Sequence, residues 1–335
     1  MVLVLSREDI ASVLEMDDVI DAVERAFVDF AKGRAKMPPR SIMDFPENDG
    51  WVGIMSAAIE TAGSIGTKVV TVFKNNAGKS MPTTMATILL NDASTGEPLA
   101  IMEAGLITAM RTGAASAIAT KYLARKDSHV VGLFGAGIQA KYQLFGVSRV
   151  RKVGNVKQYT PTKARQKKFA EEMEKEIGAK IQIVGNPKEA VQNSDIVITA
   201  TTSPTPVFNG KWVSDGTHIN AIGAHTKDTR ELDTTLIEKA KIVVDLREAA
   251  LKEAGEIVIP KAEGKKLNIY AELSELVSGK KKGRTSDSEV TVYKGCGIAL
   301  EDLAVAKLAY DLATKKALGK NIYLQNYVSN TSMYS

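Results

Sequence analysis

The feature that most constrains the fold is a glycine-rich turn between an apolar strand and a helix. Residues 130–134 have the composition of a buried strand, and Gly135-x-Gly137-x-x-Ala140 follows directly and opens a helical segment. In such a unit the first glycine makes the tight turn, the second lets backbone approach a pyrophosphate, and the small third residue lets the helix pack on the strand. The motif and its context therefore predict a dinucleotide-binding turn in a Rossmann-type sheet.

The pattern of strands and helices changes near residue 104. Before it, helical segments at 6–33 are followed by apolar runs at 51–59, 65–73, 85–91 and 99–102, which indicate an antiparallel sheet. After it, strands and helices alternate to about residue 245, which is typical of a doubly wound parallel sheet, and residues 300–318 are helical again. We expect an α/β protein with an α+β domain (1–118 with 301–335) and a Rossmann domain (119–300).

Charge and cysteine content exclude several classes of protein. The 335 residues carry 44 Lys and Arg against 39 Asp and Glu, a small surplus spread along the chain, so we expect no nucleic-acid partner. The single cysteine, Cys296, allows no intramolecular disulfide and no zinc motif, so we expect no metal and a reducing compartment. Residues 6–9 interrupt the apolar start, and no apolar run is long enough to span a membrane. These features predict a cytoplasmic protein.

The segment after the second Rossmann strand bears on the choice of cofactor. NAD-binding folds usually carry an acidic residue there for the ribose 2′-hydroxyl, but Thr160, Thr162 and Lys163 stand in its place. Hydroxyls and a cation favour a 2′-phosphate, which an acid would repel. We expect NADP(H) to be favoured, with NAD(H) as the alternative. The other interpretation is that Lys163 is only an exposed helix charge.

Three cations occur in apolar or rigid surroundings. Arg111 is the only charged residue between positions 104 and 120, Lys68 shares one face of a strand with apolar residues, and Arg40 follows two prolines. A buried guanidinium requires a partner, which for Arg111 we expect to be a ligand anion. For each cation an ion pair within the protein is the alternative. Together with the dinucleotide turn, the three predict a carboxylate-binding pocket.

A histidine follows another predicted strand, at 218–222. The strand ends in Gly223-Ala224-His225, and Asp228 lies three residues further on. Ligands of doubly wound folds bind at the carboxyl ends of strands, and imidazole is suited to proton transfer near neutral pH. We expect His225 to transfer a proton, with Asp228 as the alternative carrier. The other interpretation is that His225 only lines the cofactor.

Taken in order, these motifs resemble the ornithine cyclodeaminase/μ-crystallin family, above all its archaeal alanine dehydrogenase and ketimine reductase branches. The resemblance covers nearly the whole chain. It rests on Met37-Pro-Pro-Arg40, Gly66-Thr-Lys68, Met110-Arg111-Thr-Gly-Ala-Ala115, Gly135-Ala-Gly-Ile-Gln139, Thr217-His-Ile-Asn-Ala-Ile-Gly223, Arg230-Glu-Leu-Asp233 and Gly297-Ile-Ala-Leu-Glu-Asp302. It implies a homodimer whose first domain, completed by the C-terminal helix, binds substrate and forms the subunit interface.

The resemblance also implies roles for individual residues. Arg40, Lys68 and Arg111 fall on the family's carboxylate-binding cations, and Cys296 falls beside the substrate. The implied cofactor positions are Thr84, Ile138, Gln139, Thr160, Thr201, Ile222, Gly223 and Gly295. To these we add Gly135, Gly137, Thr162, Lys163 and His225 from the motifs above, together with Arg111.

Two positions depart from the family pattern. The family's cyclodeaminases carry a catalytic Asp where His225 stands and an acid where Gly53 stands, whereas its alanine dehydrogenases keep the Asp and have an Arg at the Gly53 position. We therefore expect an NAD(P)-dependent oxidoreductase of amino-acid metabolism that acts on the C–N bond of a small amino or imino acid. The candidates are alanine with pyruvate, or a cyclic imine such as Δ1-pyrroline-2-carboxylate. Lys68 would also polarise the imine or carbonyl. Ornithine cyclodeamination, or a crystallin-like nucleotide binder with little turnover, is the alternative.

Overall fold

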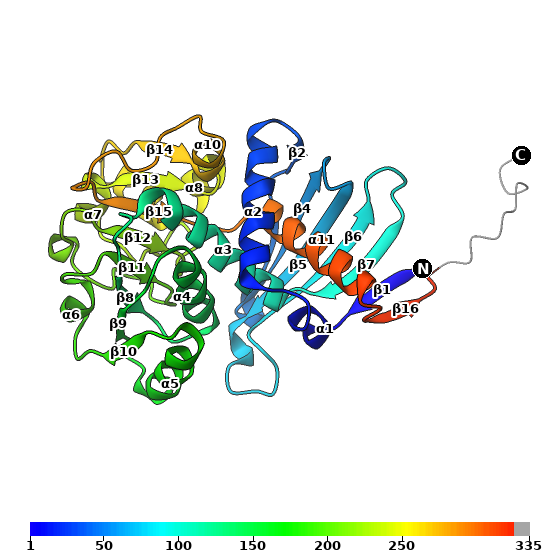
Figure 1. The fold of residues 1–335 in the computed structure, drawn as a ribbon, viewed down its shortest axis with the longest axis horizontal. Coiled ribbons are helices and arrows are strands. Elements are labelled where there is room, and N and C mark those ends of the chain that lie inside the picture. The colour runs from blue at the N-terminus through cyan, green and yellow to red at the C-terminus, as the bar shows by residue number, and fades with distance from the viewer. Residues whose placement is uncertain (325–335) are drawn as a thin grey trace, which may run out of the picture.

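The computed structural model describes residues 1–324 and contains two eight-stranded sheets with helices between and around them (Figure 1). The first sheet has the spatial order β16 (Lys320–Ile322), β1 (Val2–Leu5), β7 (Pro98–Glu103), β6 (Thr84–Asp92), β5 (Ser64–Phe73), β4 (Gly50–Ile59) and β2 (Ala35–Lys36), with β3 (Ser41–Phe45) also paired to β4. All neighbours are antiparallel except β1 and β7. The predicted antiparallel sheet is confirmed. The strands that the sequence did not reveal are the short ones, β1, β2, β3 and β16, whose pairing depends on distant segments.

The second sheet is entirely parallel. Its order is β10 (Lys180–Ile183), β9 (Asn155–Tyr159), β8 (Val130–Phe134), β11 (Ile196–Thr199), β12 (His218–Ala221), β15 (Thr291–Lys294), β13 (Lys241–Val244) and β14 (Ile269–Glu272). The predicted Rossmann-type sheet is confirmed, although β14 and β15 were not expected. The chain runs outward from β8 to β9 and β10, then returns to β11 on the other side of β8. Doubly wound sheets bind ligands at such a reversal.

The helices agree with the expected pattern, with one correction. They are α1 (Arg7–Ala11), α2 (Met16–Ala31), α3 (Gly105–Leu123), α4 (Ile138–Val150), α5 (Gln166–Ile177), α6 (Pro187–Val191), α7 (Thr234–Lys239), α8 (Arg247–Glu253), α9 (Gly255–Ala262), α10 (Leu273–Val277) and α11 (Ala299–Lys315), with 3-10 turns η1 (Pro46–Asn48), η2 (Lys74–Asn76), η3 (Lys163–Arg165) and η4 (Gly210–Trp212). The helical segment expected at 6–33 is two helices, the first opened by a capping box of Ser6 and Asp9. None of the helices within residues 1–324 is long and apolar enough to cross a membrane.

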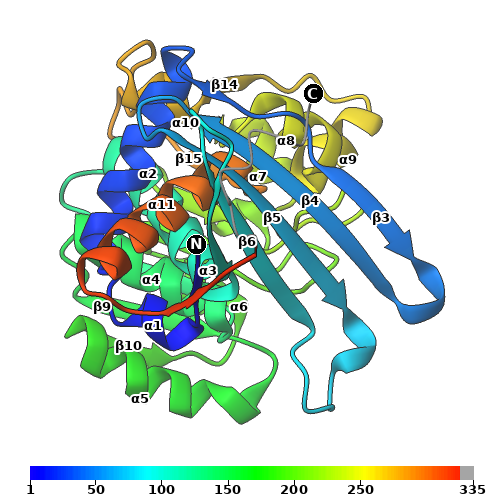
Figure 2. The same ribbon diagram turned by 90° about the vertical axis from the view of Figure 1, so that its right-hand side faces the viewer.

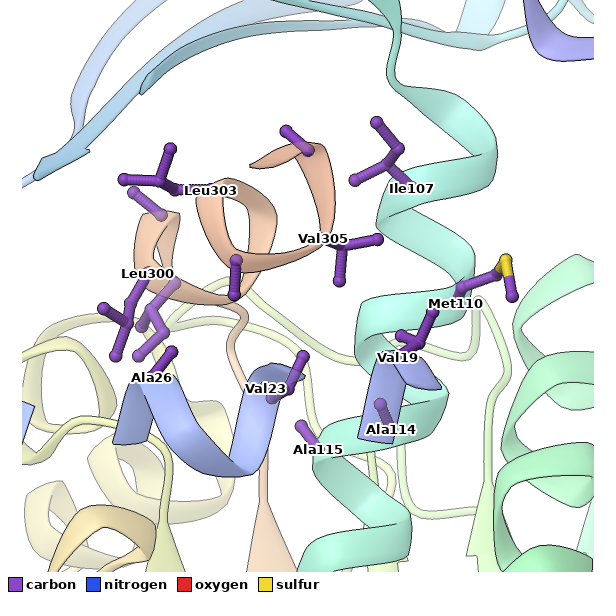
Figure 3. Close-up of a cluster of buried hydrophobic side chains, with 14 of the residues drawn as sticks. Val19, Val23, Ala26, Ile107, Met110, Ala114, Ala115, Leu300, Leu303 and Val305 are labelled. Carbon is purple, nitrogen blue, oxygen red and sulfur yellow. The ribbon is translucent and has the colours of Figure 1, made fainter. Parts of the chain in front are cut away.

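Three helices, α2, α3 and α11, pack together between the two sheets (Figures 1 and 3). Their contact surface is made of small and branched side chains, among them Val19, Ile107 and Val305. Burial of each larger apolar side chain contributes roughly 1.5–3 kcal/mol. The same core includes Ile222 and Tyr293 from the parallel sheet, so the two sheets share one continuous core. The elements of the antiparallel sheet and those of the parallel sheet are therefore packed against each other.

Helix α3 packs closely on helix α4 of the Rossmann-type region through two glycines. A Cβ atom on Gly113 would collide with the carbonyl oxygen of Tyr142 in α4, and one on Gly146 would collide with the carbonyl oxygen of Gly113. This close approach sets the position of Arg111, which lies in the same helix. The expected domain boundaries at 118 and 301 fall inside α3 and α11, so the division of the chain at these residues stays a prediction. Residues 325–335 of the expected first domain lie outside the described residues.

The first sheet has one covered face and one exposed face. Helices α2 and α11 lie on the covered side, and strands β3 to β6 extend away from them (Figure 2). On the other side Ile54 is 36%, Val69 41% and Leu89 38% exposed. These residues belong to neighbouring strands, so they form a contiguous apolar surface, which is typical of an interface.

Candidate active site

The parallel sheet brings most of the predicted cofactor residues to one edge. They follow the carboxyl ends of five neighbouring strands: Gly135, Gly137, Ile138 and Gln139 after β8, Thr160, Thr162 and Lys163 after β9, Thr201 after β11, Ile222, Gly223 and His225 after β12, and Gly295 with Cys296 after β15. Two predicted cofactor residues lie elsewhere. Thr84 is exposed at the start of β6, and Arg111 is buried in α3. Their place beside a cofactor stays a prediction.

The glycine turn after β8 has the geometry that a dinucleotide requires. Gly135 has φ +114°, and a Cβ atom there would collide with the carbonyl oxygen of Ala200, so only glycine fits. A Cβ atom on Gly137 would meet open space, which leaves this backbone accessible. Helix α4 then begins without a side-chain cap, so its first N–H groups and its positive dipole end are free to bind phosphate. The Oε1 atom of Gln139 is buried without a hydrogen-bond partner and can accept from a ribose hydroxyl.

The segment after β9 presents hydroxyls and a cation. Thr162 and Lys163 are exposed, and the Thr162 N–H donates to Thr160 Oγ1 at 3.3 Å. Residues 163–165 form the 3-10 turn η3, and α5 starts at Gln166, so these groups lie in the turn before the helix. These groups match the chemistry expected for a 2′-phosphate.

The structure corrects the expectation about Arg111. Its guanidinium is only 6% exposed and has partners within the protein: Nη1 lies 2.5 Å from Glu301 and Nε 3.0 Å from Asp302. The prediction that a ligand anion supplies the missing partner is therefore wrong, and the alternative of an internal ion pair holds. Lys68 is 2% exposed on the buried face of β5 and pairs with the other oxygen of Asp302 at 2.5 Å. Burial lowers the pKa of Lys68 to about 8, against the opposing effect of Asp302.

Arg40 completes the group of cations. Its Nη2 atom lies 2.9 Å from Glu253 and donates to the carbonyl oxygen of Gly297 at 2.8 Å. Gly297 has φ +76°, and the Arg111 guanidinium fills the space where its side chain would lie. Arg40 and Arg111 therefore meet at Gly297, while Lys68 and Arg111 share Asp302. The three cations therefore lie close together, and each is already paired with a carboxylate. That they bind a substrate carboxylate together stays a prediction.

A cavity adjoins Arg40. It has a volume of about 120 Å³, and its lining includes Arg40, Met55, Glu253 and Gly297. Lys68 and Arg111 do not line it, so Arg40 is the one of the three predicted cations that reaches this cavity. Burial also raises the pKa of Glu301, to about 7. Protonation of this carboxyl would leave more of the charge of Arg111 for a ligand.

Cys296 and its neighbours are held by another buried carboxylate. Asp245, at the end of β13, accepts the N–H groups of Cys296 and Gly297 at 2.6 Å each. Burial raises the pKa of the Cys296 thiol, which therefore stays protonated near neutral pH. Such a thiol suits contact with a substrate and does not suit nucleophilic attack.

His225 faces an aromatic residue of the other sheet. Its ring centroid is 6.1 Å from that of Trp51 in β4, at an interplanar angle of 54°. The Trp51 ring also covers Gly53, where a Cβ atom would lie 3.1 Å from it. Desolvation of the ring and then the nearby Lys294 charge lower the pKa of His225 below its ordinary value. Asp228 is exposed, three residues further along the loop.

Several residues that shape the site were not predicted. They are Trp51, Glu231, Asp245, Glu253, Glu301 and Asp302. One signal was present in the sequence: Glu301 and Asp302 are adjacent acids in the first turn of a helical segment, directly before the apolar residues 303–306. A helix N-terminus favours such acids, but their burial required cationic partners that local sequence does not reveal. Within residues 1–324 no group of three or more His, Cys, Asp or Glu side chains could hold a metal ion.

Comparison with known proteins adds independent information. The sequence profile of the ornithine cyclodeaminase/mu-crystallin family matches residues 1–317. The alanine dehydrogenase of Archaeoglobus fulgidus is 41% identical over 323 residues, which are 96% of this chain and 98% of that protein. The structure of Thermococcus litoralis Delta(1)-pyrroline-2-carboxylate reductase in complex with NADH and L-proline has a TM-score of 0.93 at 46% identity, covering 96% of this chain and 100% of that one. An archaeal alanine dehydrogenase dimer with bound NAD has a TM-score of 0.92 at 40% identity, covering 97% and 99%.

Proposed function

The chain belongs to the ornithine cyclodeaminase/mu-crystallin family, and from this premise we propose that it reduces Δ1-pyrroline-2-carboxylate or a closely related cyclic imine. At the level of reaction class it is an NAD(P)-dependent oxidoreductase that acts on a small amino or imino acid. Alanine dehydrogenation is the second candidate, supported by the identity to the alanine dehydrogenase of Archaeoglobus fulgidus.

One observation carries the preference for a cyclic imine. Trp51 lies over Gly53 and faces His225, so these rings form an aromatic surface on this side of the proposed site. A hydrocarbon ring would bury apolar surface against it, whereas the methyl group of alanine would cover little of it. The charged side-chain amine of ornithine would find no carboxylate at the Gly53 position, which disfavours cyclodeamination.

The cations would bind and orient the substrate carboxylate. Arg40 is the accessible one and has a cavity beside it, while Lys68 and Arg111 lie behind it in the buried cluster. Lys68 would also polarise the imine nitrogen through its ammonium group. Such positioning lowers the barrier because the reacting atoms are held at the right distance and angle.

His225 would carry the proton. Its Nδ1 atom lies 3.4 Å from the carbonyl oxygen of Gly223, and a carbonyl only accepts, so this contact leaves Nε2 as the acceptor. In the oxidative direction Nε2 would take a proton from the substrate amine, and in the reductive direction the imidazolium would return it. The nicotinamide, when bound, supplies or takes up the hydride. Asp228 is the alternative proton carrier.

We propose NADP(H) as the favoured cofactor, with NAD(H) accepted. The support is the set of Thr160, Thr162 and Lys163 after β9, which can bind a 2′-phosphate and includes no acid. We also propose that the protein is a homodimer in which a second copy covers the apolar face of Ile54, Val69 and Leu89. Residues 1–118 with the C-terminal helix would form this interface and the substrate side of the site. Sedimentation equilibrium tests it, and a monomer at micromolar concentration would contradict it.

The function is tested by following NAD(P)H absorbance with four substrates in parallel. These are Δ1-pyrroline-2-carboxylate, its six-membered homologue, pyruvate with ammonia, and ornithine. We expect the cyclic imines to give kcat/KM at least tenfold above pyruvate with ammonia, and ornithine to yield no appreciable proline. Preference for pyruvate would select the alanine dehydrogenase candidate. Efficient ornithine turnover would select cyclodeamination, and no turnover with any substrate would favour a nucleotide-binding protein.

A further inference from the structure

Glu231 is a fully buried carboxylate behind the carboxyl edge of the parallel sheet. Four donors surround it. Oε1 accepts the N–H and the hydroxyl of Thr201, both at 2.7 Å. Oε2 accepts the N–H of Gly223 at 2.6 Å and the hydroxyl of Thr199 at 2.8 Å. Both oxygens are therefore fully used by groups that only donate in these contacts.

These donors belong to two different loops. Thr201 follows β11, and Gly223 follows the neighbouring strand β12. Beyond the strand ends, backbone N–H groups no longer have partners in the β-sheet hydrogen-bond ladder. The Glu231 carboxylate accepts hydrogen bonds from such N–H groups in both loops. It thereby fixes the backbone of one loop relative to the other. A Cβ atom on Gly223 would collide with Thr201 and with Glu231 itself, which is why glycine occupies this position.

A second set of buried charges, Glu256 and Lys294, is hydrogen-bonded to the backbone on either side of the site. The backbone N–H of Glu231 donates to Glu256 Oε1 at 2.8 Å, and Glu256 lies 3.6 Å from the Nζ atom of Lys294. Glu256 and Lys294 are both fully buried. Lys294 donates in turn to the carbonyl oxygens of Ala221 and Ala224, the latter immediately before His225. The network thus reaches from the loop after β11 to the backbone that carries the proposed proton carrier.

We propose that Glu231 is a positioning residue for the nicotinamide cofactor: its carboxylate holds the loops of Thr201 and Gly223 in the arrangement that binds the cofactor. This inference rests on the proposed placement of the cofactor at the carboxyl edge of the sheet. It assigns Glu231 no contact with substrate. It requires the charge and both oxygens of the side chain, because each oxygen accepts from one backbone N–H that cannot turn away.

The test is Glu231→Gln, which keeps the size of the side chain. In either amide orientation the NH2 group faces a backbone N–H, so one of the two loops loses its acceptor. We expect Kd for NAD(P)H, measured by fluorescence titration without substrate, to rise about tenfold or more. KM for the imino acid at saturating cofactor should change less than about threefold, because the substrate cations are untouched.

Asp195 provides the matched control. It is a carboxylate at the amino edge of the same sheet, where it accepts the N–H groups of His129 and Val130 at 3.0 and 2.9 Å. Asp195→Asn should lower the melting temperature without changing Kd for NAD(P)H. If both variants change Kd equally, or if Glu231→Gln leaves it unchanged while the wild type binds NAD(P)H, the positioning role is overturned. If the wild type binds neither NADH nor NADPH, the proposed function itself fails.

A milder variant keeps the test informative if Glu231→Gln does not fold. Thr199→Val removes one hydroxyl donor from Oε2 and preserves shape and both backbone contacts. We expect Kd for NAD(P)H to rise about threefold, with the same small effect on KM for the imino acid. A Kd equal to that of the wild type in a folded Thr199→Val protein would overturn the proposal.

Discussion

The two halves of the site use charge in opposite ways. On the cofactor side, the groups that face outward are mainly glycines, backbone N–H groups and hydroxyls, together with the exposed Lys163. The buried carboxylates Asp245 and Glu231 lie behind them and hold loops. On the substrate side, the functional groups are themselves charged side chains, and each of the three cations is paired with a carboxylate. The cofactor half is a backbone site fixed by buried charges. The substrate half is a balanced cluster of charges from five separate segments.

This difference explains why the two halves respond differently to change. A backbone site depends on turn geometry and on small residues, so it tolerates exchange of exposed side chains. A balanced ionic cluster depends on every member, since removing one charge leaves its partner buried and uncompensated. Stability and activity are therefore expected to be coupled in the substrate half and largely separable in the cofactor half.

The largest expected effect comes from removing Arg111. Arg111→Ala leaves Glu301 and one contact of Asp302 without a guanidinium, so we expect the free energy of unfolding to fall by about 3–5 kcal/mol. In protein that remains folded, kcat/KM should fall a hundredfold or more, on the order of 2.7 kcal/mol of transition-state stabilisation. Denaturant melts and steady-state kinetics measure the two quantities separately.

Lys68→Ala is the matched variant within the same cluster. Asp302 keeps its contact with Arg111, so the fold should lose much less stability while kcat/KM again falls about a hundredfold or more. Near wild-type activity of Lys68→Ala, together with unfolding of Arg111→Ala, would show that the cluster is structural. The carboxylate-pocket interpretation would then be wrong.

The same difference explains why the sequence predicts the cofactor half of the site better than the substrate half. The turn from Gly135 to Gln139 is local: strand, glycines and helix lie within a dozen residues, and their spacing alone specifies the geometry. The pairing of Arg111 with Asp302 joins residues 191 positions apart, through the packing of α11 on α3. No local pattern reveals this pairing, so the sequence alone predicts a ligand anion where the structure has an internal partner. Strand β15 was missed for a related reason, because it enters the sheet between β12 and β13 and out of chain order.

The next largest effect is expected for His225, which lies where the two halves of the site meet. His225→Ala should keep NAD(P)H binding but lower kcat tenfold to a hundredfold, which is the lower range for loss of a general acid or base. Asp228→Ala is the control on the same loop and should retain most activity, because His225 is the residue that faces Trp51 across the site. Full activity of His225→Ala with loss in Asp228→Ala would transfer the proton-carrying role to Asp228. His225 would then only line the nicotinamide.

A pH profile probes the substrate half without removing any side chain. Lys68 is cationic below its pKa of about 8 and neutral above it. Because the carboxylate needs that charge, kcat/KM should fall as the pH rises through 8, approaching tenfold per pH unit. In Lys68→Arg, the guanidinium stays charged, so whatever activity remains should lack this alkaline limb. An unchanged limb in Lys68→Arg would assign the ionisation to another group.

The smallest expected effect belongs to the cofactor half, where one half-buried side chain is exchanged. Thr160→Asp places a carboxylate beside the position proposed for the 2′-phosphate, so it should raise Kd for NADPH about tenfold, or 1.4 kcal/mol, and change Kd for NADH much less. Stability should be unchanged, because Thr160 is held only by the turn to Thr162. Lys163→Gln should also raise Kd for NADPH, because it removes an attractive charge without adding a repulsive one. A wild-type preference for NADH of tenfold or more would contradict the NADP(H) proposal. It would leave the contrast between the two halves intact, since that contrast concerns how loops and charges are held and not which ribose is bound.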